Sequence, residues 1–185
     1  MIDAVFIHPG GVHGIFGILG GTLPAVEPSL WPRILLSYLL DRSRTGTIIE
    51  QDAEGLSFAE VAARVDALGP RLVVICVHGH QPSASTQAMP AARAIAEVIR
   101  ALRDPPLILM LGNHPSALPE QTLREEPVDF VCDGEGPLTI DGLLSNDPKN
   151  STYLGYIPGL VWWNDGKIVR NPRAALLDLD RDLHG

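Results

Sequence analysis

Short apolar segments alternate with helix-like segments along most of the chain, and this alternation constrains the fold more than any other feature. Residues 72–77 and 107–111 are apolar throughout, as parallel strands buried on both faces require. Further strands are predicted at residues 3–7, 47–50 and 128–132. Strands that alternate with helices in this way imply right-handed crossovers and a doubly wound parallel sheet.

Helical patterns fill the spaces between these strands. They are predicted at residues 30–41, 57–68, 85–103, 118–125 and 138–144. Ser57 and Glu60 have the spacing of a capping box, which marks the start of the second helix. The order of elements predicts an α/β, flavodoxin-like (Rossmann-like) fold, with a five-stranded parallel sheet in the order 2-1-3-4-5.

Two further strand-like segments follow this unit. Residues 159–163 and 167–170 flank Asn164, Asp165 and Gly166, a combination typical of a β-hairpin. Beyond Pro172 the sequence has the character of an acidic linker. We therefore divide the chain into an α/β domain at residues 1–150, a hairpin appendage at 151–172 and a linker at 173–185.

The charge and hydropathy of the chain exclude some partners. The formal net charge is −8 at pH 7, whereas nucleic-acid binding needs a basic surface. No apolar run approaches the roughly 18 residues that cross a bilayer, and no basic flank of a signal peptide precedes the first strand. We expect a soluble, cytoplasmic protein that binds neither nucleic acid nor membranes. Cys76 and Cys132 lie in apolar strands, so we expect two buried thiols and no disulfide.

The segments that follow the predicted strands are rich in glycine and histidine. Ligands of open α/β sheets bind outside the carboxyl ends of the strands, near the point where the strand order reverses. Glycine allows close approach of a backbone to a ligand, and a long connection such as that after the first strand is often functional. The predicted binding residues are His8, Pro9, Gly10, Gly11, His13, His78, Gly79, His80, Ser83, Ser85, Gly112, Asn113, His114, Gly134, Glu135 and Gly136.

Several common signatures are missing from the sequence. No G-x-G-x-x-G follows the first strand, and no lysine precedes Lys149, which excludes a Walker A loop. No G-x-S-x-G nucleophile elbow occurs. His78 and His80 have a spacing that zinc ligands can use, but no further Cys, His or Asp completes such a site. Two other functions stay open, namely a stand-alone hydrolase with His78 or His80 as base and a cofactor-free interaction or sensor domain.

Four short stretches carry a family resemblance. Residues 111–120 read LGNHPSALPE and residues 126–136 read EPVDFVCDGEG. Residues 52–57 (DAEGLS) and 157–160 (IPGL) add to the match. With these motifs the chain resembles, over essentially its whole length, the N-terminal cobalamin-binding domain of B12-dependent radical S-adenosylmethionine (SAM) enzymes of the methyltransferase class.

The resemblance implies that a cobalamin lies on the carboxyl edge of the sheet. Its nucleotide tail would run along the loops after strands one, three, four and five, and residues 78–85 and 134–136 would bind its amides and its phosphate or ribose. Gly112 would leave room for the tail, so that Gly112→Val would weaken binding at least about tenfold while the fold survives. We expect no histidine ligand to cobalt, because no partner that would orient one is visible. His13 is the leading exception.

The resemblance also implies that catalysis belongs to another domain. A radical SAM domain holds a 4Fe–4S cluster through closely spaced cysteines, whereas Cys76 and Cys132 are far apart in the sequence. In the family a barrel usually follows a segment such as residues 178–180. We therefore expect the isolated chain to be non-catalytic and to present cobalamin to an absent radical SAM domain, which would hold the cluster and SAM, for methyl transfer or a related radical reaction.

Overall fold

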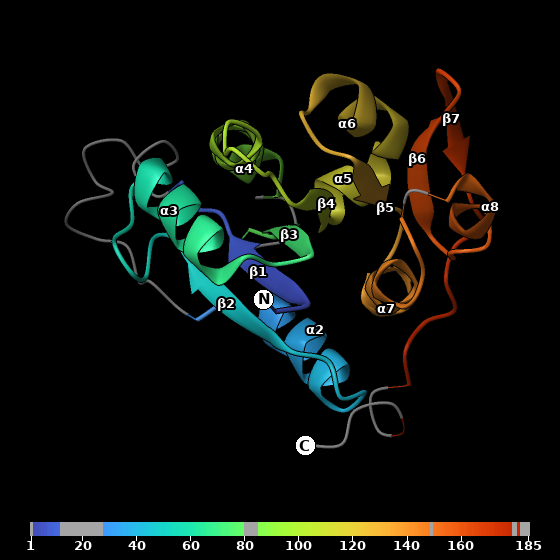
Figure 1. The fold of residues 1–185 in the computed structure, drawn as a ribbon, viewed down its shortest axis with the longest axis horizontal. Coiled ribbons are helices and arrows are strands. Elements are labelled where there is room, and N and C mark those ends of the chain that lie inside the picture. Colours follow the sequence, from blue (N-terminus) through green and yellow to red (C-terminus); the bar gives the residue numbers. More distant parts are fainter. Residues whose placement is uncertain (1, 12–27, 80–84, 149, 179–180, 182–185) are drawn as a thin grey trace.

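The computed structural model describes residues 2–11, 28–79, 85–148, 150–178 and 181, which form one sheet covered by helices on both faces (Figure 1). The strands are β1 (Ala4–His8), β2 (Gly46–Glu50), β3 (Leu72–Val77), β4 (Leu107–Gly112), β5 (Phe130–Cys132), β6 (Leu160–Asn164) and β7 (Lys167–Arg170). The helices are α2 (Leu30–Leu40), α3 (Phe58–Leu68), α4 (Ser85–Arg100), α5 (Asn113–Ala117), α6 (Pro119–Glu125), α7 (Pro137–Ser145) and α8 (Ser151–Leu154).

The strand order confirms the predicted topology. The described strands form one sheet in the order β2-β1-β3-β4-β5-β6-β7, in which β1 to β5 pair in parallel. The predicted order 2-1-3-4-5 is therefore correct. Strand β6 pairs antiparallel with β5, where Val161 lies opposite Val131, and β7 pairs antiparallel with β6. The predicted hairpin thus extends the main sheet by two strands.

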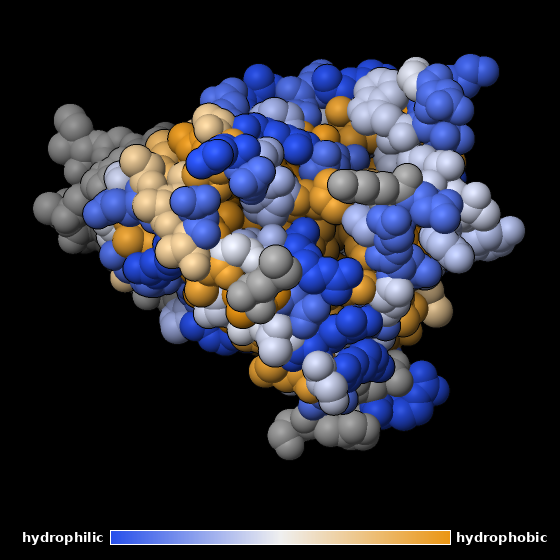
Figure 2. All heavy atoms as spheres, in the orientation of Figure 1, coloured by the Kyte–Doolittle hydropathy of each residue, from blue (hydrophilic) through white to orange (hydrophobic). Residues whose placement is uncertain are grey.

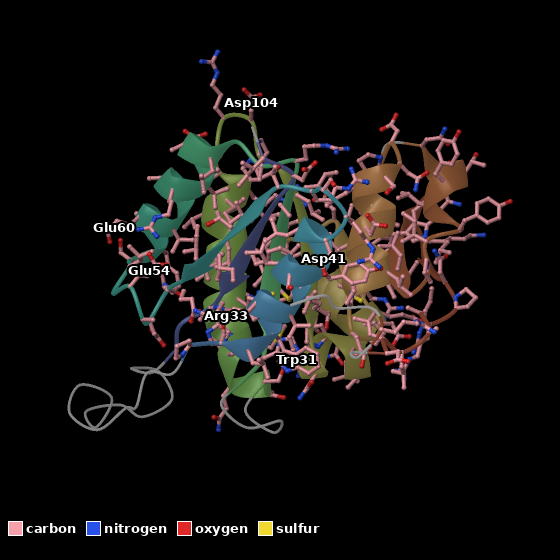
Figure 3. All side chains as sticks on the ribbon, turned by 90° about the horizontal axis from the view of Figure 1, so that it is seen from below. Trp31, Arg33, Asp41, Glu54, Glu60 and Asp104 are labelled. Carbon is pink, nitrogen blue, oxygen red and sulfur yellow. The ribbon has the colours of Figure 1, made fainter. Side chains whose placement is uncertain are left out.

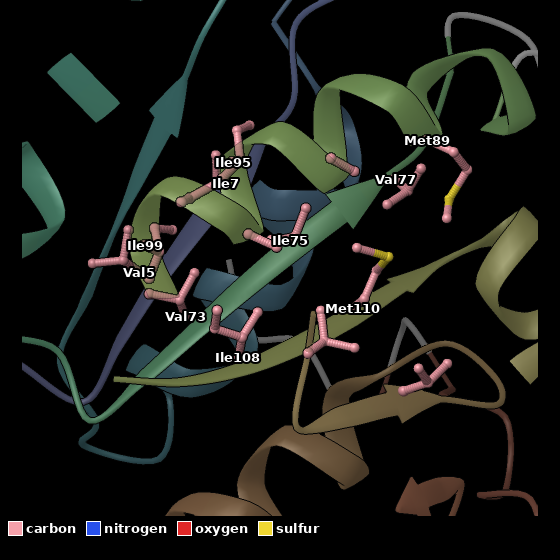
Figure 4. Close-up of a cluster of buried hydrophobic side chains, with 14 of the residues drawn as sticks. Val5, Ile7, Val73, Ile75, Val77, Met89, Ile95, Ile99, Ile108 and Met110 are labelled. Carbon is pink, nitrogen blue, oxygen red and sulfur yellow. The ribbon is translucent and has the colours of Figure 1, made fainter. Parts of the chain in front are cut away.

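Two hydrophobic cores lie on opposite faces of the sheet, because successive residues of a strand point to opposite sides. One core contains Val73, Ile75 and Val77 of β3 with residues of α3, α4 and α6. Figure 4 shows the strand residues of this core against side chains of α4. The other core contains Val74 and Cys76 of the same strand with residues of α2 and α7. Strand β3 is buried along its whole length, as its apolar sequence predicted.

On the surface, hydrophilic residues cover much of the face shown in Figure 2, with apolar residues between them.

Local chemistry sets several element boundaries. The predicted capping box is present at α3: the Ser57 hydroxyl accepts from the Glu60 N–H, and the Glu60 carboxylate accepts from the Ser57 N–H. Asp165 and Gly166 both have positive φ, as a type I′ hairpin turn requires. Helix α4 ends before the predicted residue 103, because Leu102 N donates to Ile99 O and so tightens the last turn. Helices α5 and α8 were not predicted.

Both cysteines are free and buried, as expected. Burial raises the pKa of the Cys76 thiol, and it raises the pKa of Cys132 to about 11. Both groups are therefore neutral thiols at pH 7. Among the described helices, none has the length and apolar character needed to cross a membrane.

Candidate binding site at the carboxyl edge

The parallel strands all end at one edge of the sheet, where two cavities share Trp31 and His78 in their walls. Trp31 lies at this end of the molecule, opposite the end that carries Asp104 (Figure 3). The larger cavity, about 380 Å³ in volume and here called the β4–β5 cleft, is lined by Trp31, His78, Gly112, Asn113, Ser116, Ala117, Gly134, Glu135 and Arg173. The smaller cavity, about 220 Å³ in volume and here called the α2 cavity, is lined by His8, Pro28, Ser29, Leu30, Trp31, His78 and Gly79.

His78 and Trp31 line both cavities and are stacked on each other. Their ring centroids are 5.2 Å apart and their planes differ by 16°. His8 Nε2 donates a hydrogen bond of 3.0 Å to the carbonyl oxygen of His78, which ties the end of β1 to the segment after β3. The Nδ1 atom of His78 is buried and has no hydrogen-bond partner. The structure therefore brings His8 and His78 together, as their positions after neighbouring strands predicted.

Ser29 enters the α2 cavity from the start of helix α2. It occupies the N-cap position, yet its side chain makes no capping hydrogen bond. Its hydroxyl oxygen is buried and has no partner. The backbone around it is well fixed, because Ser29 N donates to Glu50 Oε2 at 3.1 Å and Arg33 donates to both Ser29 O and Glu50. The hydroxyl group is thus held in place without a bond of its own.

Gly112, at the end of β4, is required for a reason other than the expected one. Its φ of 134° and ψ of −177° lie in a region that only glycine adopts readily. A Cβ atom added there would lie 2.0 Å from the carbonyl oxygen of Val77 in β3. The missing side chain therefore gives room to the neighbouring strand, and the expectation that Gly112→Val spares the fold is wrong on these distances. The residue still lines the β4–β5 cleft.

Ser85 joins the segments that follow β3 and β4. Its hydroxyl group donates to Val77 O at 2.5 Å and accepts from His114 N at 2.9 Å. The residue is buried, with 2% of its surface exposed. His114 Nδ1 lies 3.0 Å from the hydroxyl oxygen of Thr86 at the start of α4. Ser85 and His114 therefore position the wall of the cleft, whereas their neighbour Asn113 lines it directly.

The loop after β5 forms the opposite wall. Gly134 and Gly136 both have positive φ, and Glu135 Oε2 accepts from Leu177 N at 3.1 Å. A Cβ on Gly134 would meet nothing within 4 Å, whereas one on Gly136 would lie 3.0 Å from Leu111 Cδ2. Gly134 and Glu135 line the cleft, and Gly136 packs behind it.

Three predicted residues, Pro9, Gly10 and Gly11, lie outside the walls of these two cavities. Gly10 N donates to Gln51 Oε1 and Gly11 N donates to Asp52 Oδ2. Both glycines line a separate groove of about 790 Å³ between α3 and α4. Pro9 is buried. The structure does not place these three residues in the β4–β5 cleft or the α2 cavity.

Some predicted residues cannot be placed, and some lining residues were missed. His13, His80 and Ser83 lie outside the described residues. Within the described residues, no group of three or more His, Cys, Asp or Glu side chains is arranged to hold a metal ion. Ser29, Trp31 and Arg173 were not predicted as site residues. The only available signal was the position of Ser29 and Trp31 at the predicted start of a helix beside the strand ends.

The buried imidazole of His78 predicts a loss of stability in weak acid. Burial, and to a lesser degree the charge of His8, lowers the pKa of His78 from 6.5 to about 4. The unfolded chain therefore binds more protons between about pH 6.5 and pH 4, so stability falls as the pH decreases through this window. The slope from this group is at most about 1.4 kcal/mol per pH unit. His78→Phe, which keeps a ring against Trp31, is expected to flatten the dependence of the urea midpoint on pH; an unchanged slope would contradict this assignment.

A comparison with protein families finds a match to the B12 binding domain over residues 16–144. Among curated proteins, an uncharacterized methyltransferase of Pyrococcus horikoshii, PH0819, is 31% identical over 150 residues. That alignment covers 79% of this chain and 31% of the relative.

Solved structures with a similar fold include two radical SAM enzymes, both with cobalamin bound. The enzyme OxsB with aqua-cobalamin bound superposes with a TM-score of 0.73 at 16% identity, covering 99% of this chain and 24% of OxsB. The methyltransferase TsrM from Kitasatospora setae, with cobalamin and a 4Fe–4S cluster bound, gives a TM-score of 0.67 at 19% identity, covering 96% of this chain and 30% of TsrM. At these identities the likeness concerns the fold. The chain spans about a third or less of the length of these relatives.

Proposed function

The chain belongs to the B12-binding domain family, and from this premise we propose that it binds one cobalamin at the carboxyl edge of its sheet. In this proposal the chain is the cofactor-holding module of a larger radical SAM enzyme of the methyltransferase class. Cobalamin supplies the cobalt chemistry of group transfer when bound, and the protein supplies position and polarity. The residues of this chain therefore bind, orient and shield the cofactor.

The observation that carries this proposal is the pair of cavities that meet at the Trp31–His78 stack. Both open at the carboxyl ends of the parallel strands, where α/β sheets bind their ligands. Large apolar side chains are exposed on the segments that flank this edge, among them Leu30, Trp31 and Leu118. A cobalamin has broad apolar surfaces and a rim of amides, so an edge with apolar side chains and unpartnered polar atoms fits it.

We assign different roles to the two walls of the cleft. Asn113, Gly134 and Glu135 line it and would contact the cofactor directly. Ser85 would hold the β3 and β4 segments at a fixed separation through its two hydrogen bonds. Trp31 would pack against the cofactor with the ring face that is turned away from His78. His13, His80 and Ser83 stay proposed contacts.

The radical SAM part of the reaction is proposed to take place on a separate domain. TsrM holds a 4Fe–4S cluster and OxsB holds SAM in structures whose chains are three or more times as long as the matched segment. Cys76 and Cys132 are buried thiols in two strands of the sheet and do not have the clustered spacing that an iron–sulfur centre uses. We keep the division into residues 1–150, 151–172 and 173–185, with the hairpin strands β6 and β7 built onto the sheet of the first unit.

The experiment that tests the function is cobalamin binding by the purified chain. After incubation with hydroxocobalamin and desalting, we expect a stoichiometric complex with the absorption spectrum of the base-off form, in which dimethylbenzimidazole has left the cobalt. Calorimetry at tens of micromolar cobalamin, which covers Kd values of about 1 μM and below, gives the affinity. If no heat and no retained absorption are found, the chain is not a cobalamin module; a base-on spectrum would overturn only the assigned geometry.

A matched pair of tryptophan variants locates the site. Trp31 at the cavities and Trp163 on β6 have similar exposed fractions, 37% and 45%. Trp31→Ala is expected to weaken cobalamin binding at least about tenfold, or about 1.4 kcal/mol, because it removes the ring between the two cavities. Trp163→Ala is expected to bind as the wild type does. Equal affinities in the two variants would place the cofactor elsewhere.

A further inference from the structure

Two residues that line the α2 cavity each have a buried polar atom without a hydrogen-bond partner. The atoms are Ser29 Oγ and His78 Nδ1. Both residues line this cavity. A buried polar atom without a partner loses its bonds to water and gains nothing in return. Two such atoms, on residues that line the same cavity, point to a polar ligand group at this position.

The Ser29 hydroxyl group could cap helix α2, but it makes no capping hydrogen bond in the structure. A serine at an N-cap normally accepts a hydrogen bond from the first turn of its helix, as Ser57 does at α3. Ser29 occupies the same position at α2 but makes no such bond. The hydroxyl is therefore available to a ligand without loss of an existing cap.

The charges around the cavity favour a neutral ligand group. Glu50, the nearest acid to Ser29, accepts from Ser29 N and forms an ion pair with Arg33. The charges of Glu50 and Arg33 offset each other. The Glu50 carboxylate also lies at the start of α2, and it takes the position where the helix would otherwise stabilise an anionic ligand. Burial keeps the pKa of His78 near 4, so its imidazole is neutral at pH 7. The remaining lining side chains, apart from His8, carry no ionisable group.

A primary carboxamide matches these two atoms in chemistry. A neutral imidazole offers one donor and one acceptor nitrogen, a hydroxyl offers both functions, and a carboxamide offers an acceptor oxygen and a donor NH₂. A carboxamide can therefore pair with either tautomer of His78 and with the hydroxyl group of Ser29. Trp31 holds the imidazole plane by stacking on it. The corrin ring of cobalamin carries primary carboxamides around its rim.

We infer that Ser29 and His78 form a subsite in the α2 cavity that binds one primary carboxamide of the corrin ring. This inference rests on the proposed function and adds to it a specific contact on the β1 and α2 side of the stack. The β4–β5 cleft, on the other side, is left for another part of the cofactor. The sequence motifs of the strand ends do not suggest Ser29, although they include His8, His78 and Gly79 of the same cavity.

Cobalamin derivatives with single hydrolysed amides test the subsite. The probes are hydroxocobalamin and the series in which each primary amide in turn is a carboxylic acid. For the wild-type chain, we expect one member of the series to bind at least about tenfold more weakly than hydroxocobalamin, because an anion replaces the amide beside neutral groups. In Ser29→Ala and His78→Phe, hydroxocobalamin itself should bind more weakly, and the difference between it and that derivative should shrink.

Ser57→Ala is the matched control. It removes a serine that does cap its helix, so its melting temperature should fall while the tenfold difference between the two probes stays. Ser29→Ala should keep its melting temperature, because no cap is lost. If every derivative binds the wild type as hydroxocobalamin does, or if the difference persists undiminished in both variants, the subsite is overturned although the function stands. If hydroxocobalamin itself does not bind, the proposed function fails first.

Discussion

Gly112→Ala is expected to destabilise the fold by about 2–6 kcal/mol, and Gly112→Val by more. Two costs combine at this position. The φ of 134° with ψ of −177° is a region that costs a residue with a Cβ about 1–3 kcal/mol. The Cβ would also lie 2.0 Å from Val77 O, so that β3 and β4 must separate, and overpacking of this kind costs about 1–3 kcal/mol more. Urea unfolding followed by circular dichroism measures the sum.

Gly134→Ala is the control for this prediction. Gly134 has a φ of 139°, similar to that of Gly112, but an added Cβ would meet nothing within 4 Å. Its substitution is expected to show the backbone cost alone, about 1–3 kcal/mol. If Gly112→Ala unfolds at the same urea concentration as Gly134→Ala, then the close approach to Val77 adds nothing to the loss of unfolding free energy. In that event the earlier expectation, that a side chain at 112 mainly disturbs the ligand, would return.

The parallel part of the fold could be predicted because its signals are local and strong. A continuous apolar run as short and as rich in valine and isoleucine as residues 72–77 favours a strand covered on both faces. Asp165 and Gly166 likewise specify the hairpin turn through their own backbone preferences. The attachment of that hairpin to β5 could not be predicted, because it depends on a pairing between residues such as Val131 and Val161 that are distant in sequence.

The sequence places the candidate site at the edge where the structure has its two cavities, but it misses several of the residues that line them. His8 and His78 follow neighbouring strands, so topology alone brings them together. Trp31 and Ser29 enter the site through the placement of α2 against the sheet, and Arg173 enters through its bond to Asp133. These are tertiary contacts without a local signature. Ser85 was predicted as a binding residue, whereas the structure shows it bonded to Val77 and His114 at the back of the cleft wall.

Asp133 joins the strand-end loop to the segment after the hairpin, and its surroundings are asymmetric. Its carboxylate accepts from Arg170 through Oδ2 and from Arg173 through Oδ1, each at 2.7 Å from Nε. The Asp133 side chain is 1% exposed, whereas the side chains of Arg170 and Arg173 are 44% and 63% exposed. Water can therefore solvate the two guanidinium groups when the carboxylate is removed, but it cannot solvate the carboxylate when the guanidinium groups are removed.

This asymmetry predicts that removing both cations costs much more than removing the anion. The double variant Arg170→Gln, Arg173→Gln leaves a buried carboxylate without a counter-charge, and we expect it to lose about 3–5 kcal/mol of unfolding free energy. Asp133→Asn leaves only exposed arginines unpaired, and partly exposed ion pairs contribute about 0–1 kcal/mol each. The triple variant, which adds Asp133→Asn to the two glutamines, should recover most of the loss, because no buried charge remains. Urea unfolding of the three variants distinguishes these cases. A triple variant no more stable than the double variant would mean that the arginines act through packing of their side chains, and not through the charge of Asp133.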